Sequence, residues 1–146
     1  MNTSSPGVFA AAFTALGNGL PHLLPQFLAA VALLAAGVAL YILVTPFRER
    51  ELVVQGNAAA GTVLAGAIVG IAIPLAATLA TSGAFLDIVV WGIVAVILQL
   101  LTVVGVSLVF HQLRRQIEGG NVAAALTLAA TQIAIALLNA AVMVPT

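Results

Sequence analysis

Residues 48–81 read RERELVVQGNAAAGTVLAGAIVGIAIPLAATLAT, a charged cluster followed closely by a long apolar segment. The apolar part, from Asn57 to Thr81, has no charged residue and exceeds the roughly 20 residues that a helix needs to cross a bilayer. Its apolar residues run continuously instead of alternating, which favours a helix over a strand of a membrane barrel. This stretch therefore predicts a membrane-spanning helix that begins beside a charged loop.

The composition of the whole chain agrees with this interpretation. It is 63% hydrophobic and 5% charged, and its charges lie in 48–51 and 114–118 apart from Asp87. Such a chain has too few polar groups to cover a water-soluble surface, so we expect an integral membrane protein surrounded by lipid. A length of 146 residues holds about four spans and no separate soluble domain.

The fold predicted from the apolar segments is an all-α membrane domain with four transmembrane helices over residues 23–146. The spans are expected at about 23–44, 57–81, 86–110 and 121–144. Thr45-Pro46 and Ser82-Gly83 are expected to end helices, whereas Asn57 and Asn121 stand where helix N-caps belong.

The N-terminal residues 1–22 are expected to form an arm outside the bundle. Residues 8–16 are short for a span and are a weak candidate for an interfacial helix, since they lack a basic polar face. Residues 17–22, GNGLPH, are rich in turn formers and predict an exposed bend.

The arginines predict the orientation of the chain. All four (Arg48, Arg50, Arg114 and Arg115) lie in loops that an up-down-up-down path places on one side of the membrane. Cytoplasmic loops carry the excess of arginine and lysine, so this side is expected to be cytoplasmic and both termini extracytoplasmic.

An internal repeat is also predicted. Gly56-Asn57-Ala58-Ala59-Ala60 aligns with Gly120-Asn121-Val122-Ala123-Ala124 at an offset of about 64 residues (121 less 57), the length of one helical hairpin. Two parallel hairpin repeats, over about 23–81 and 86–144, would be related by an axis along the membrane normal.

Several motifs occur in a specific order along the chain. GNAAA at 56–60 is followed by GIAIPL at 70–75, WG at 91–92, QLL at 99–101 and NAA at 139–141. In this order they resemble the YjfL-like bacterial inner-membrane proteins, the family catalogued as domain of unknown function 350. The resemblance covers the chain from about the first span to its end. It implies an inner-membrane protein built from two paired-helix repeats, and it implies no reaction or ligand.

Several functions are disfavoured by the sequence. A net charge of zero without lysine removes the electrostatic attraction on which nucleic-acid binding depends. The chain has no Cys, no paired carboxylates and no recognisable catalytic motif. His22 and His111 are expected on opposite sides of the membrane, so they cannot share a metal site. We therefore expect neither an enzyme nor a cofactor or metal.

Uncharged polar residues within the spans form the candidate site. Gln132 and Asn139 lie seven residues apart on one helix face, and Gln99 and Thr102 share a face of another span. Pro74 removes a backbone hydrogen bond and leaves a carbonyl near Gly70 without its donor. These groups either hydrogen-bond across helices and fix packing, which we favour, or line a hydrated path or bind a small polar solute.

Glycines in the second span predict close packing of helices. Gly61, Gly66 and Gly70 give a stripe of small residues that lets another helix approach, either within the chain or in a second subunit. The function predicted best is a homo-oligomeric assembly with a channel-like or passive transport role. The alternative is a membrane scaffold or accessory subunit that docks protein partners through its charged loops.

Overall fold

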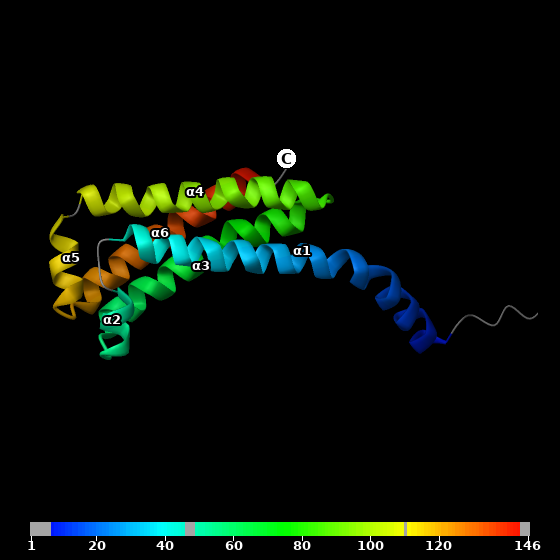
Figure 1. Ribbon diagram of the computed structural model, residues 1–146, viewed down its shortest axis with the longest axis horizontal. Coiled ribbons are helices and arrows are strands. Elements are labelled where there is room, and N and C mark those ends of the chain that lie inside the picture. The colour runs from blue at the N-terminus through cyan, green and yellow to red at the C-terminus, as the bar shows by residue number, and fades with distance from the viewer. Residues whose placement is uncertain (1–6, 46–48, 110, 144–146) are drawn as a thin grey trace, which may run out of the picture.

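The computed structural model describes residues 7–45, 49–109 and 111–143, and the described part is helical (Figure 1). Four long helices are apolar enough to cross a membrane. In chain order the helices are α1 (Val8–Val44), α2 (Glu49–Val54), α3 (Ala58–Thr81), α4 (Phe85–Val109), α5 (His111–Glu118) and α6 (Val122–Met143).

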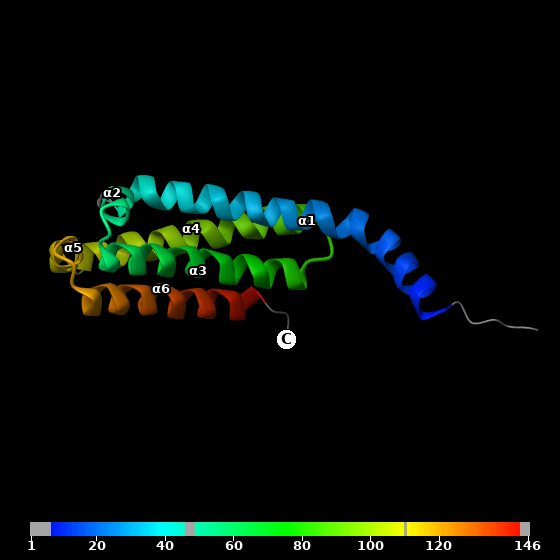
Figure 2. The same ribbon diagram turned by 90° about the horizontal axis from the view of Figure 1, so that it is seen from below.

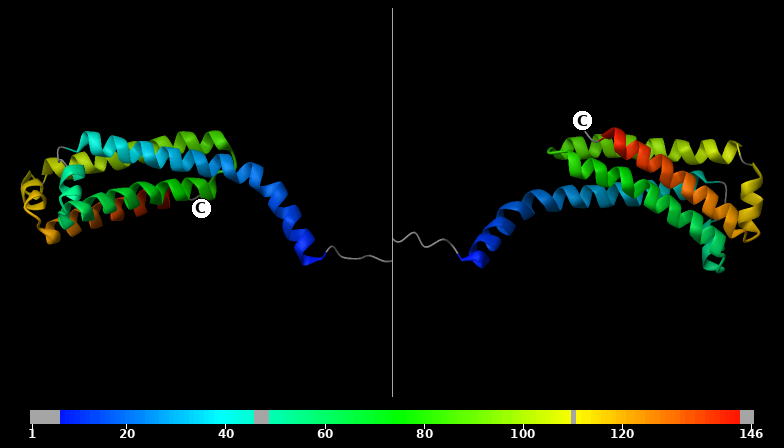
Figure 3. Two further views of the ribbon diagram at one scale, coloured as in Figure 1. Left: turned by 60° about the horizontal axis from the view of Figure 1, so that its bottom comes forward. Right: turned by 180° about the vertical axis from the view of Figure 1, so that it is seen from behind.

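The ends of α3, α4 and α6 agree with the predicted spans to within one or two residues. Thr45 follows the last residue of α1, and Ser82-Gly83 lie between α3 and α4. The short helices α2 and α5 were not predicted; the sequence suggested only charged loops there. They lie at the same end of the bundle (Figures 1 and 3). The two charged clusters are therefore on one side of the molecule, as the path predicted from the sequence requires.

The predicted bend at 17–22 is wrong, because α1 runs without interruption from Val8 to Val44 and contains Pro21 and Pro25. Each proline removes one N–H donor and disfavours a straight helix, yet membrane helices tolerate such losses. The first part of α1 extends past the other helices and curves away from them (Figures 1 and 2). Its apolar side chains, such as Phe9 and Phe13, are exposed.

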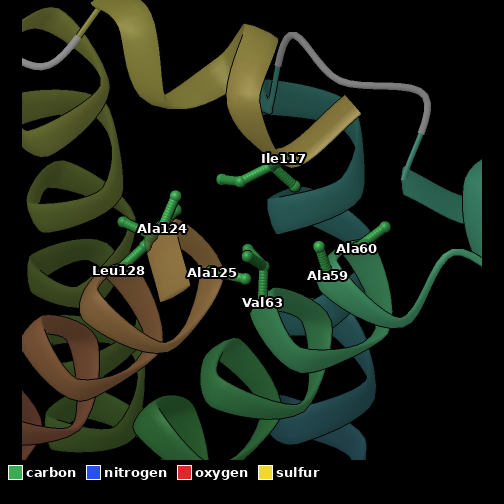
Figure 4. Packing of buried hydrophobic residues seen from close by; sticks show 7 residues of the cluster. All are labelled: Ala59, Ala60, Val63, Ile117, Ala124, Ala125 and Leu128. Carbon is green, nitrogen blue, oxygen red and sulfur yellow. The ribbon is translucent and has the colours of Figure 1, made fainter. Parts of the chain in front are cut away.

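Small residues allow the long helices to pack closely. α3 packs against α6 along most of its length (Figure 2). One buried cluster joins α3, α5 and α6, with Ile117 lying over alanines of both long helices (Figure 4). Its members are Ala59, Ala60, Val63, Ile117, Ala124, Ala125 and Leu128. A second cluster joins α1, α3 and α4 around Tyr41, Ile71 and Val96.

The starts of α3 and α6 are built alike. The Asn57 side chain accepts a hydrogen bond from the Ala60 N–H at 3.1 Å, and the Asn121 side chain accepts one from the Ala124 N–H at 3.2 Å. The glycine before each asparagine has a φ near 83°, which L residues with side chains rarely adopt. The structure therefore confirms both expected caps. The parallel repeat of the two hairpins stays a prediction.

Candidate functional site: a buried polar cluster

A carboxylate and a phenol meet where α1 and α2 come together. The Tyr41 hydroxyl, from the last turn of α1, donates a hydrogen bond to Glu49 Oε1 at 2.7 Å. Both side chains are 1% exposed, and Glu49 Oε2 has no protein partner in the described part of the chain. Burial raises the pKa of Glu49 to about 7, although the hydrogen bond from Tyr41 lowers it. Glu49 is therefore a proton-binding group near neutral pH.

Sequence reasoning missed the burial of Glu49, since it lies among arginines in a cluster that suggests a solvated loop. The position of Leu52, three residues after Glu49, indicates this burial. Glu49 and Leu52 share a face of α2 at a spacing of i and i+3, and Leu52 packs on the cluster around Ala59. A short amphipathic helix over 49–54 would have predicted that this glutamate faces the bundle.

Two amides meet between α4 and α6. Gln99 Nε2 donates a hydrogen bond to the main-chain carbonyl of Gln132 at 2.9 Å, and the two side chains are 2% and 0% exposed. The Gln132 side chain also lies close to the Tyr41 hydroxyl, without a hydrogen bond of good geometry. Tyr41, Glu49, Gln99 and Gln132 therefore form a continuous buried polar cluster that connects four helices.

Two glycines of α3 make room for this cluster. A Cβ on Gly70 would stand 2.6 Å from Gln99 Nε2, and one on Gly66 would stand 2.5 Å from the Ala129 Cβ. Gly70 thus faces Gln99 of α4 and Gln132 of α6, whereas Gly66 faces α6, all within the same chain. Gly61 has no atom of another helix within 4 Å of its Cβ position. The close contact therefore includes Gly66 and Gly70 but not Gly61.

The remaining members of the predicted polar site lie apart from the amide pair. Thr102 bonds back to the Leu98 carbonyl of its own helix, and the Pro74 carbonyl accepts a hydrogen bond from the Thr78 hydroxyl. Asn139 lies nearer the other end of α6, in a pocket that also contains Asp87. The structure thus brings together Gln99 and Gln132, and it places Asn139 at a second location.

Four buried polar atoms of the cluster lack a protein hydrogen bond among the described residues. They are Glu49 Oε2, Gln99 Oε1, Gln132 Oε1 and Gln132 Nε2. Leaving a buried polar atom without a partner costs about 1–3 kcal/mol, so such atoms normally contact ordered water or an ion. The set contains three acceptors and one donor, which suits water, a proton or a small polar solute.

Side chains of Asn57 and Arg114 form polar contacts at the charged end of the bundle. Asn57 Nδ2 donates to the carbonyls of Ile117 and Glu118, both at 3.2 Å, and so connects α3 to the last turn of α5. Arg114 forms an ion pair with Glu118 at 3.0 Å. Arg50 and Arg115 are exposed, and Arg48 lies outside the described residues.

Comparison with known proteins decides the family. The family model of the Domain of Unknown Function (DUF350) matches residues 15–143, which contain the polar cluster, α3, α4, α6 and α1 from residue 15 onward. The chain belongs to the DUF350 family. The UPF0719 inner membrane protein YjfL of Escherichia coli K12 is 32% identical over 129 residues, covering 84% of this chain and 98% of that protein. The protein of that name from the O157:H7 strain gives the same values. No solved structure matches the chain significantly.

Membership of the DUF350 family and four apolar helices make this chain a multi-pass inner-membrane protein. The resemblance of the motifs to this family is thereby confirmed. The predicted orientation of the termini stays a prediction, as does the oligomeric state.

Proposed function

We propose that this DUF350 protein forms an oligomeric inner-membrane assembly with a channel-like, passive transport role. The observation that supports the proposal is the group of four unpartnered polar atoms buried around Gln132. A bundle of apolar helices gains little stability from such atoms, because each is costly unless water or a solute contacts it. A hydrated interior satisfies them and provides the polar part of a path.

The chemistry of the cluster limits what such a path conducts. Amides and a phenol bind solutes through dipoles, so selectivity arises from geometry. Glu49 adds a carboxylate at the arginine-bearing end of the bundle, and the cluster contains no cationic side chain. This arrangement favours neutral solutes, protons and small cations over anions.

Flux through liposomes tests this role. Purified wild-type protein is reconstituted and assayed for movement of protons, potassium, sodium and a neutral solute such as glycerol. Gln99→Leu and Gln132→Leu should abolish the flux because they remove the amides. Thr127→Val is the matched control on α6, since the exposed Thr127 hydroxyl donates to the Ala123 carbonyl of its own helix. A wild-type protein that conducts none of these solutes contradicts the proposal.

The alternative is a scaffold or accessory subunit, and the charged end of the bundle favours it. A groove of about 320 Å³ lies between α2 and α5, lined by Glu51, Leu52, Gln55, Arg114 and Glu118. Exposed Arg50 and Arg115 occur on the same two helices. Two results together would support the scaffold in place of the channel. The purified protein would be impermeable to all of the solutes, and Arg50→Ala and Arg115→Ala would abolish its binding to a protein partner in the native membrane.

A further inference from the structure

A second polar site lies at the end of the bundle away from α2 and α5. A pocket of about 520 Å³ is formed by the end of α3, the beginning of α4 and the end of α6. In Figure 2 the end of α3 lies between the beginning of α4 and the end of α6. Residues of the loop between α3 and α4 also line the pocket, so it opens where the spans end.

One wall of this pocket suits a positive charge. Asp87 is the only charged residue outside the two clusters, and Trp91 follows four residues later on the same face of α4. A carboxylate accepts hydrogen bonds from an ammonium group, and the face of an indole ring attracts a cation held within about 6 Å. Asp87 and Trp91 are both exposed to the pocket and supply the two kinds of group that attract an ammonium ion.

The other walls supply a donor and an apolar surface. Asn139 Nδ2 is buried without a hydrogen-bond partner in the described part of the chain, and Asn139 lines the same pocket. An amide N–H₂ donates to phosphate or ester oxygens. Val94, Leu98 and Val142 give the pocket an apolar side that suits hydrocarbon.

We propose that this pocket binds the headgroup of an ammonium-bearing phospholipid such as phosphatidylethanolamine. In this arrangement the ammonium group lies at Asp87 and Trp91, and the first carbons of an acyl chain lie on the apolar side. The Asn139 amide, whose Nδ2 is buried in the structure, turns so that its N–H₂ donates to the phosphate or ester oxygens. An acidic residue in the first turn of a helix and an interfacial tryptophan are common on their own. Neither explains the buried amide donor in the same pocket. This site is separate from the cluster around Gln132 and does not depend on a transport role.

Trp91 provides the measurement, because it is the only tryptophan of the chain. Protein in dodecyl maltoside micelles, which contain no ammonium group, is titrated with short-chain phosphatidylethanolamine while tryptophan fluorescence is recorded. Parallel titrations use short-chain phosphatidylglycerol and ethylammonium chloride. Asp87→Asn removes the charge at nearly constant shape. Glu118→Gln is the matched control, since it removes a carboxylate at the far end of the bundle.

The expected result is a saturable change of fluorescence with phosphatidylethanolamine. The affinity for this lipid should be at least about tenfold weaker in Asp87→Asn, as loss of a charge-assisted hydrogen bond predicts, and unchanged in Glu118→Gln. Asn139→Leu should also weaken binding. Equal responses to phosphatidylethanolamine and phosphatidylglycerol would overturn the proposal, as would equal affinities of the wild type and Asp87→Asn. Ethylammonium that saturates the change as tightly as the lipid would overturn it in favour of a free amine.

Discussion

Replacing Gly66 by alanine is the sharpest test of how α3 and α6 pack. The added Cβ would stand 2.5 Å from the Ala129 Cβ and 2.7 Å from its Cα, whereas non-bonded carbons prefer about 3.5–4.0 Å. The two helices must therefore separate by about 1 Å. Overpacking of this kind costs about 1–3 kcal/mol of unfolding free energy. Adding Ala129→Gly should not restore stability, because the backbone Cα remains too close.

Gly61→Ala is the matched control on the same helix. Its Cβ meets nothing within 4 Å, so only the higher helix propensity of alanine acts, with a gain of up to about 1 kcal/mol. The assay is unfolding of the purified variants in mixed micelles of sodium dodecyl sulfate, followed by far-ultraviolet circular dichroism. Equal stabilities of Gly61→Ala and Gly66→Ala would refute the packing argument, as would full recovery of Gly66→Ala by Ala129→Gly.

Three further predictions concern the charged end of the bundle. Because burial raises the pKa of Glu49 from 4.5 to about 7, the wild type should lose about 3 kcal/mol of stability as pH rises from about 4.5 to 7. Glu49→Gln, which keeps the acceptor for Tyr41, should abolish this loss, and a variant as pH-dependent as the wild type would contradict it. Asn57→Ala should lower the free energy of unfolding by about 2 kcal/mol and Asn121→Ala by about 1 kcal/mol, because both cap a helix but the Asn57 side chain also donates to carbonyls of α5. Equal losses of stability in thermal unfolding would show that the hydrogen bonds to α5 contribute nothing. Reporter fusions after Arg50 should be cytoplasmic and fusions after Thr146 extracytoplasmic, and the reverse result would show that the arginines do not set the orientation.

The sequence predicts the four spans because length and continuous hydrophobicity suffice for a helix in lipid. The starts of α3 and α6 could be placed because a glycine and an asparagine N-cap precede each helix, and the chemistry of such a cap is local. The start of α1 could not be placed in this way. Gly17 and Pro21 favour a turn in water, but in this chain they lie inside a long apolar helix.

The candidate site could be predicted only in part, because burial depends on contacts between helices. Gln99 and Gln132 are polar residues within apolar spans, so the sequence identifies them as a site, but their mutual contact depends on how α4 packs beside α6. Glu49 was missed because the orientation of a short helix decides whether a charged residue faces water or the bundle. Asn139 shares a helix face with Gln132 yet lines a pocket two helical turns away from the cluster, because the two residues are seven positions apart on α6.

A high-resolution experimental structure of the protein in lipid tests the central claim most directly, because it shows whether the buried polar cluster is hydrated. The account predicts ordered water or solute density within hydrogen-bond distance of the Gln132 amide and of Glu49 Oε2, continuous with one side of the membrane in the assembled protein. A dry, fully packed cluster in which these atoms bond only to protein groups would contradict the channel-like role and favour the role of a scaffold or accessory subunit.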